Sequence, residues 1–251
     1  MTEFKTLLFE KYMKYFKEEP NGEFLSACDT HYNLLCEYNE RFNLTRITDM
    51  AGSVLLHYID SIFIAIAGSE KILKDGVWIC DVGSGGGFPA FPLFFYIHYQ
   101  KKVKNAKLTM IESSNKKSGF LDVVIASLDL SKSVRTSPLR AEEAGHESKL
   151  REKYDIITAR ALAFLPTLLE YVSPFMKVGA AGLLMKGEDV DNEKLESKKA
   201  LSELKLKMKE DFVYEIEGMT YKRRVLIIEK TGQLPKKYPR NPGIPKKTPI
   251  S

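Results

Sequence analysis

An apolar run that leads into an acidic residue and a glycine-rich turn constrains the fold of this chain most. The run is Val77-Trp78-Ile79-Cys80, and the segment after it is Asp81-Val82-Gly83-Ser84-Gly85-Gly86-Gly87-Phe88-Pro89. A short, bounded apolar run is typical of a strand buried on both faces in a parallel sheet. Glycines permit positive φ and let a ligand approach the backbone. The loop is therefore expected where parallel sheets bind nucleotides, outside the carboxyl ends of the strands.

The spacing of the glycines favours one cofactor over another. A dinucleotide fingerprint has the frame G-x-G-x-x-G/A, but here the bulky Phe88 occupies the last position, which argues against NAD. The frame acidic-x-Gly-x-Gly-x-Gly is filled by Asp81, Gly83, Gly85 and Gly87. It resembles the S-adenosylmethionine loop of Rossmann-like methyltransferases. A tight turn without a ligand is the alternative interpretation of the loop alone.

A second acidic residue follows the next predicted strand, where Leu108–Ile111 leads into Glu112. In nucleotide-binding βαβ folds, an acidic residue at this strand end accepts hydrogen bonds from ribose hydroxyls. The lysine-rich segment 101–107 lengthens the spacing and is interpreted as a solvated surface connection. The alternative role for Glu112 is to start the helix that follows it.

The rest of the chain predicts an α/β fold. The predicted strands are 77–81, 108–112, 133–136, 155–159, 180–185, 211–217 and 223–229. Helical stretches separate the first six, residues 192–209 being a solvated helix, and Gly218–Tyr221 joins the last two as a hairpin. We therefore expect a mostly parallel seven-stranded sheet with a terminal antiparallel hairpin, the topology of Rossmann-like methyltransferases.

Residues 1–75 are predicted to be an N-terminal helical cap packed on this domain. Three sets of apolar residues recur at helical spacing, within residues 4–16, 25–35 and 54–66. Thr48 or Asp49 is the expected N-cap of the third helix. The predicted organisation is thus a cap (1–75), a methyltransferase domain (76–230) and a tail (231–251).

The tail carries the net charge of the chain. Residues 231–251 contain Lys236, Lys237, Arg240, Lys246 and Lys247 and no acidic residue, which accounts for the whole net charge of +5. Five of the eleven prolines also lie here, so the tail is predicted to contain neither helix nor central strand. A basic extended segment with Tyr238 is suited to follow phosphates and to stack on a base. A disordered, solubilising end is the alternative.

Other features predict a reduced, cytoplasmic protein that does not span a membrane. The apolar stretch 88–99 is too short for a span, and no signal-peptide pattern opens the chain. Cys28, Cys36 and Cys80 lack the spacing of a metal site and are interpreted as free thiols. The four scattered histidines receive no role, and no metal is expected.

Seven segments, in chain order, resemble the bacterial 16S rRNA guanine-N7 methyltransferase family, RsmG. They are Phe42-Asn43-Leu44-Thr45, His57-Tyr58-Ile59-Asp60-Ser61, Asp81–Pro89, Arg140-Ala141-Glu142, Thr158-Ala159-Arg160-Ala161, Met185-Lys186-Gly187 and Lys236-Lys237-Tyr238-Pro239-Arg240. The resemblance begins near residue 24. Ala90 stands where family members usually carry Gly.

The resemblance implies a set of site residues. The family's contacts with S-adenosylmethionine fall on Gly83, Phe88, Glu112, Ala141, Glu142 and Arg160. It also implies 16S rRNA in the small ribosomal subunit as the substrate. By hypothesis one basic approach to the target guanine is formed by Arg160, Lys186, the run Lys222-Arg223-Arg224 and the tail. Truncation of the tail is then expected to weaken RNA binding and to leave cofactor affinity unchanged.

The chemistry implied by the resemblance requires no general base, because guanine N7 has a lone pair and no proton to remove. This agrees with the absence of a convincing catalytic triad or metal motif in the sequence. Two other functions remain open at this point. A small-molecule methyltransferase would not need the basic tail, and a non-enzymatic RNA-binding module would not need the glycine loop and Glu112.

Overall fold

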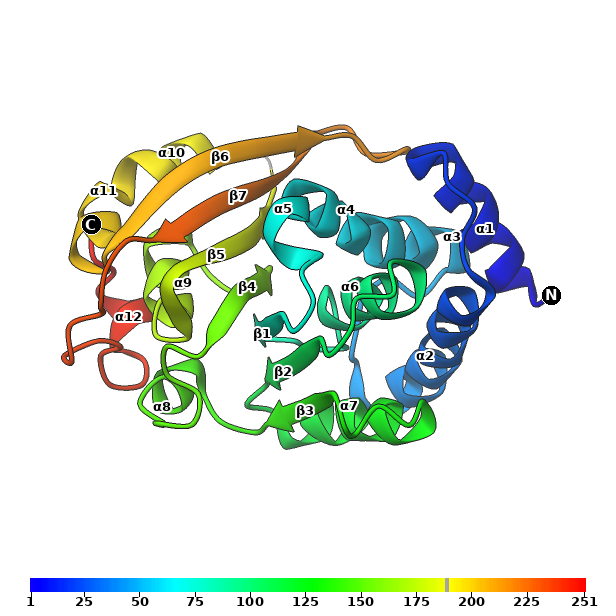
Figure 1. The fold of residues 1–251 in the computed structure, drawn as a ribbon, viewed down its shortest axis with the longest axis horizontal. Coiled ribbons are helices and arrows are strands. Elements are labelled where there is room, and N and C mark those ends of the chain that lie inside the picture. The colour runs from blue at the N-terminus through cyan, green and yellow to red at the C-terminus, as the bar shows by residue number, and fades with distance from the viewer. Residues whose placement is uncertain (188–189) are drawn as a thin grey trace.

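The computed structural model describes residues 1–187 and 190–251 and places one sheet between two layers of helices (Figure 1). The strands are β1 (Trp78–Val82), β2 (Lys107–Ile111), β3 (Val134–Ser137), β4 (Tyr154–Arg160), β5 (Met176–Lys186), β6 (Leu206–Tyr214) and β7 (Arg223–Lys230). Their order is β3-β2-β1-β4-β5-β7-β6, and β7 runs in the direction opposite to the other six strands. The predicted seven-stranded sheet with a terminal hairpin is confirmed.

Two boundaries near the end of the sheet differ from the prediction. The predicted helix 192–209 is wrong in its last part: α10 (Val190–Glu196) and α11 (Lys198–Glu203) are followed by β6 from Leu206. Leu206 and Met208 face the apolar core while Lys207 and Lys209 are exposed, a period of two that the high charge of the segment obscured. Pairing with β7 decides the outcome, because Leu206 lies opposite Lys230. β5 also begins four residues earlier than expected, at Met176.

The three predicted N-terminal helices are present. They are α1 (Glu3–Phe16), α2 (Gly22–Phe42) and a third helix made of α3 (Met50–Ser53), η1 (Val54–Ile59) and α4 (Asp60–Ala67). Asp49 is the N-cap of the third helix, because its carboxylate accepts the Gly52 N–H at 2.6 Å. The middle part, η1, is a π-helix, which the apolar periodicity did not predict. A short helix, α5 (Ser69–Ile72), leads to β1.

Each face of the sheet carries its own apolar core. On one face the N-terminal helices pack with α6 (Ala90–Phe95), η2 (Tyr96–Gln100) and α7 (Asn115–Ser127) over strand residues such as Ile79. On the other face α8 (Ala141–Ala144), α9 (Leu165–Val172), α10 and α11 cover residues such as Cys80. Ile79 and Cys80 therefore point to opposite faces, as alternation along a strand requires. The domain boundary at residue 75 stays a prediction.

Within the part of the chain that the structure describes, the third helix alone is long and apolar enough to be compared with a membrane span. Its 18 residues Met50–Ala67 have the length and composition of a membrane span. More than half of this segment is buried inside the protein, however, and it contains the fully buried Asp60. This burial is typical of a core helix in a folded domain.

The tail is folded against the second face, which corrects two predictions. It contains a short helix, α12 (Ile244–Lys247), because proline is tolerated in the first turn of a helix. The Tyr238 ring is buried, so the prediction that it stacks on a base is wrong. Leu234 and Ile250 are also buried, and Figure 1 shows the C-terminus beside α11.

Candidate active site

The glycine-rich loop leaves the carboxyl end of β1 and is fixed to β2 by the Gly83 N–H, which donates to the Ile111 carbonyl at 2.8 Å. Gly83, Gly85 and Gly87 all have positive φ, the region where side chains are strained. A Cβ on Gly87 would lie 2.3 Å from the Phe91 ring, whereas a Cβ on Gly85 would meet no atom within 4 Å. The loop is thus packed against Phe91 at Gly87, whereas the space next to Gly85 is open.

Glu112 lies beside this open part of the loop. Its carboxylate accepts the Gly85 N–H at 2.9 Å and the Ser114 N–H at 2.8 Å. The side chain is nearly buried, yet each oxygen retains a further acceptor position. The predicted juxtaposition of the loop and the acidic residue after β2 is therefore present in the structure.

Asp81 is fully buried at the end of β1. Its Oδ1 accepts the Thr158 hydroxyl at 2.6 Å, while Oδ2 has no partner among the described residues. Burial raises the pKa of this carboxyl to about 6, because the low dielectric disfavours the charged form. An unpartnered buried carboxylate oxygen beside the loop is a polar group that a ligand would satisfy.

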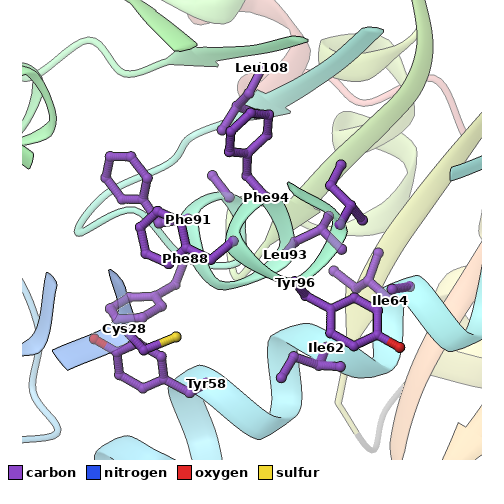
Figure 2. Packing of buried hydrophobic residues seen from close by; sticks show 14 of the residues in the cluster. Cys28, Tyr58, Ile62, Ile64, Phe88, Phe91, Leu93, Phe94, Tyr96 and Leu108 are labelled. Carbon is purple, nitrogen blue, oxygen red and sulfur yellow. The ribbon is translucent and has the colours of Figure 1, made fainter. Parts of the chain in front are cut away.

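Two buried histidines connect the N-terminal helices to the loop. The His31 Nε2 is 2.9 Å from the Gly86 carbonyl, which can only accept, so Nε2 carries the proton and Nδ1 accepts the Tyr58 hydroxyl. Burial lowers the pKa of His31 to about 4. The second histidine, His57, stacks on the Phe88 ring with centroids 4.1 Å apart. Phe88 itself is buried beside Tyr58 (Figure 2), so its ring supports the loop from the core side.

Arg160 is the last residue of β4, and its guanidinium group packs over the Phe88 ring. It donates to the Leu56 carbonyl at 2.7 Å and to His57 Nδ1 at 3.1 Å. Because a guanidinium only donates, His57 is neutral with its proton on Nε2, which donates to the Thr45 hydroxyl. Burial, followed by the charge of Arg160, lowers the pKa of His57 to about 3. The hydrogen bonds of Arg160 therefore tie it to the third N-terminal helix, although part of its side chain stays accessible.

A pocket of about 600 Å³ opens at the carboxyl ends of β4 and β5, next to Arg160. Three cations line it: Arg160, Lys186 and Arg223. Lys186 forms an ion pair with Glu193 at 2.5 Å, which also lines the pocket. The remaining wall is largely apolar or aromatic and includes Leu56, Leu168, Met185, Met219 and Tyr221. The cations of this pocket can donate hydrogen bonds to acceptors on the edge of a flat ring, and its apolar and aromatic walls can pack against the faces of that ring.

Ala141 and Glu142 begin α8, on the tail side of the sheet. The Glu142 carboxylate accepts the Gly243 N–H at 2.9 Å, so the tail contacts a predicted cofactor residue directly. The buried Glu170 is likewise paired with Arg240 of the tail. Truncating the tail would leave both carboxylates without these partners. Truncation is therefore expected to disturb Glu142 as well, and the separation of RNA binding from cofactor binding stays a prediction.

The predicted RNA-binding residues do not form one surface. Lys186 and Arg223 line the pocket with Arg160, but Arg224 points away and pairs with Asp191 and Asp211. Adjacent strand residues face opposite sides of a sheet, which explains the separation of Arg223 from Arg224. Arg240 is bound to Glu170, whereas Lys236, Lys237, Lys246 and Lys247 are exposed.

Sequence reasoning missed the residues that support the site from the N-terminal helices: His31, His57 and Asp60. His57 and Asp60 lie in a segment that carries the family resemblance, but sequence reasoning assigned none of the three a role, and no local pattern marks their partners. Within residues 1–187 and 190–251, no group of three His, Cys, Asp or Glu side chains is placed to hold a metal ion.

Comparison with known proteins identifies the family. The family model described as GidB, rRNA small subunit methyltransferase G, matches residues 25–224. The chain belongs to this family. Proteins named ribosomal RNA small subunit methyltransferase G are 42% identical in Acetivibrio thermocellus, covering 87% of this chain and 86% of that protein, and 38% identical in Lysinibacillus sphaericus, covering 88% of each.

Solved structures at low identity show the same fold. The [4+2]-cyclase SpnF is 12% identical, with a TM-score of 0.55 and coverage of 85% of this chain and 98% of that one. TYW2 of P. horikoshii, solved with MeSAdo, is 14% identical, with a TM-score of 0.51 and coverage of 69% and 62%. As a member of the rRNA small subunit methyltransferase G family, the chain is an S-adenosylmethionine-dependent methyltransferase. The predicted fold class, enzyme class and cofactor are confirmed.

Proposed function

We propose that this methyltransferase transfers a methyl group from S-adenosylmethionine to N7 of a guanine in the 16S rRNA of the small ribosomal subunit, in the cytoplasm. The observation that supports it most is the pocket lined by Arg160, Lys186 and Arg223 beside the glycine-rich loop. Relatives named for small-subunit rRNA supply the substrate class. The target atom, guanine N7, rests on the family resemblance. The cytoplasmic location rests on the place where ribosomal RNA is found.

The loop residues fit the cofactor. Asp81, Gly83, Gly85 and Glu112 would hold it, because they offer an unpartnered buried oxygen, open space above the backbone and free acceptor positions for hydroxyls. When bound there, S-adenosylmethionine would supply an activated methyl group on a positively charged sulfur, and the acceptor nitrogen would take up that charge with the methyl group. Phe88, Ala141, Glu142 and Arg160 remain proposed contacts of the same site.

The chain's own residues need only bind and align the acceptor. Guanine N7 and O6 are acceptors, and arginine and lysine are their common partners. His57 Nδ1 is already bonded to Arg160, so this histidine does not offer a free base, and N7 chemistry requires none. The deep major groove of A-form RNA excludes side chains, so the target guanine must be presented from an unpaired or junction region.

The exposed lysines of the tail would contact phosphates outside the pocket. Lys236, Lys237, Lys246 and Lys247 are exposed, and phosphate contacts of this kind add affinity without sequence readout. Lys186, Arg223, Arg224 and Arg240 remain proposed RNA contacts, although each also has an acidic partner within the protein.

The experiment is transfer of labelled methyl groups from S-adenosylmethionine to small subunits that lack the modification, followed by nuclease digestion and mass spectrometry of the nucleosides. We expect N7-methylguanosine. A Glu112→Gln variant should weaken cofactor binding by about tenfold, because it removes charge-assisted hydrogen bonds to hydroxyls. Transfer only to small molecules, or no transfer despite measured cofactor binding, would reject the rRNA substrate.

A further inference from the structure

Asp60 is a fully buried carboxylate between the N-terminal helices and the pocket. It accepts two hydrogen bonds from Arg223, at 3.0 and 2.5 Å, and one from the Tyr214 hydroxyl at 2.7 Å. Arg160 approaches the same carboxylate at 3.5 Å. One side chain of α4 thus contacts both arginines of the pocket wall, which come from β4 and β7.

The π-helix η1 provides the geometry for these contacts. The Asp60 N–H bonds to the Leu55 carbonyl, one residue further back than in an α-helix, while the Leu56 carbonyl accepts from Arg160. Arg160 is therefore held by three residues that lie within about one turn of the third helix: Leu56, His57 and Asp60. Single-turn π segments within helices are frequent at functional sites.

The charges also favour a role in the reaction. Arg160 and Arg223 carry two positive charges, and Asp60 is the carboxylate that contacts both. Their side chains are only 15% and 16% exposed, so solvent screens them weakly. The acceptor base gains a positive charge during N7 methylation, and an unbalanced pair of guanidinium groups beside it would oppose that step.

We propose that Asp60 is a positioning residue that holds Arg160 and Arg223 in place for the acceptor base and balances their charge, an inference that rests on the proposed rRNA methylation. It acts through the two arginines and does not itself touch the substrate. The competing interpretation is a purely structural ion pair that attaches α4 to the sheet. If Asp60 is a positioning residue, a folded Asp60 variant has impaired catalysis. If Asp60 is only structural, a folded variant keeps its kcat.

Three variants separate these interpretations. Asp60→Asn removes the charge and keeps the shape. Tyr214→Phe removes one hydrogen bond to Asp60 and leaves every charge in place. Asp29→Asn is the matched control, because Asp29 is a buried carboxylate of the same helical layer that pairs with Thr2 and Lys5 in α1 and its preceding turn. Cofactor affinity, the unfolding midpoint, and kcat and KM for small subunits are measured for each.

For Asp60→Asn we expect at least about a tenfold loss of kcat with the Kd for S-adenosylmethionine within about twofold of wild type, because misplaced binding groups impair alignment. Asp29→Asn should lose stability and keep kcat. If Asp60→Asn does not fold, Tyr214→Phe decides: a severalfold lower kcat at unchanged cofactor affinity supports the proposal. Wild-type kcat in either folded Asp60→Asn or Tyr214→Phe would overturn it. A wild-type protein that fails to methylate subunits would instead reject the proposed function, and this inference with it.

Discussion

The three glycines of positive φ in the cofactor loop have different structural reasons. At Gly83 and Gly87 a Cβ would collide with Leu162 or Phe91, so these positions are limited by packing beneath the loop. At Gly85 a Cβ would enter open space beside Glu112. A side chain added at Gly85 would therefore enter the space where the cofactor is proposed to bind, without disturbing the packing beneath the loop.

We predict that Gly85→Ala lowers the affinity for S-adenosylmethionine at least tenfold while destabilising the protein by only about 1 kcal/mol, the cost of a left-handed alanine. Gly119→Ala is the matched control, because Gly119 lies within α7 and its Cβ also meets nothing. That variant should bind cofactor normally and gain some helix stability. Calorimetric titration and urea unfolding measure the two effects. Equal cofactor affinity in Gly85→Ala and wild type would place the ligand elsewhere.

The C-terminal tail is an element with two kinds of cation. Arg240 donates to both oxygens of the buried Glu170 and to the Thr248 carbonyl. The Thr167 hydroxyl of α9 donates to the Pro245 carbonyl at 2.9 Å, which fixes α12 on α9. The lysines at 246 and 247 belong to the same element but are exposed. The tail is therefore anchored through its arginine, and its exposed lysines at 246 and 247 are the proposed phosphate contacts.

We expect Arg240→Gln to destabilise the protein by about 3 kcal/mol, because it leaves the buried Glu170 carboxylate without its counter-charge. The paired change Lys246→Gln and Lys247→Gln should leave the unfolding midpoint unchanged. It should weaken binding to small subunits and reduce the slope of log K against log salt concentration by about 2. Filter binding over a salt series tests this. An unchanged slope would show that these lysines do not contact phosphates.

At the scale of the whole molecule, the N-terminal helices and the sheet share one apolar core, and buried histidines join them to the loop. His31 and His57 are neutral in the folded state, and burial lowers their pKa values to about 4 and about 3. In the unfolded chain a histidine binds a proton near pH 6.5. As pH falls below 6.5 the unfolded state binds protons first, so the free energy of unfolding decreases until the folded histidines also titrate.

Burial of His31 therefore predicts a loss of roughly 3 kcal/mol between pH 6.5 and pH 4. Asp81 acts in the opposite direction, because its raised pKa of about 6 lets the folded state bind a proton before the unfolded state does. The two histidines together outweigh this single carboxyl group, so the free energy of unfolding still decreases. His31→Gln keeps a donor for Gly86 and an acceptor for Tyr58 and should flatten the profile. His98→Gln, at a half-exposed position, should change it less. Urea unfolding at pH 7 and pH 4.5 measures the difference, and identical profiles for wild type and His31→Gln would contradict the assignment.

Local sequence was sufficient for the cofactor loop and for the sheet except the start of β6, which pairing with β7 decided. The seven apolar runs, the acidic residue after β2 and the positions of Gly83, Gly85 and Gly87 follow from periodicity and backbone geometry, which act over a few residues. The N-terminal helices followed from their spacing for the same reason. The tail was mispredicted because a high proline content excludes helix interiors but not the first turn of a short helix.

The sequence by itself determined the α/β fold, the loop and the residues at strand ends, since each depends on contacts between near neighbours in the chain. Only the tertiary structure decided which polar residues meet in the site. Asp60 and Arg223 are far apart in sequence, as are His31 and Gly86, and their pairing depends on how helices and strands pack. Burial then keeps His31 and His57 neutral by lowering their pKa values, because the dielectric around a side chain is a property of the folded molecule.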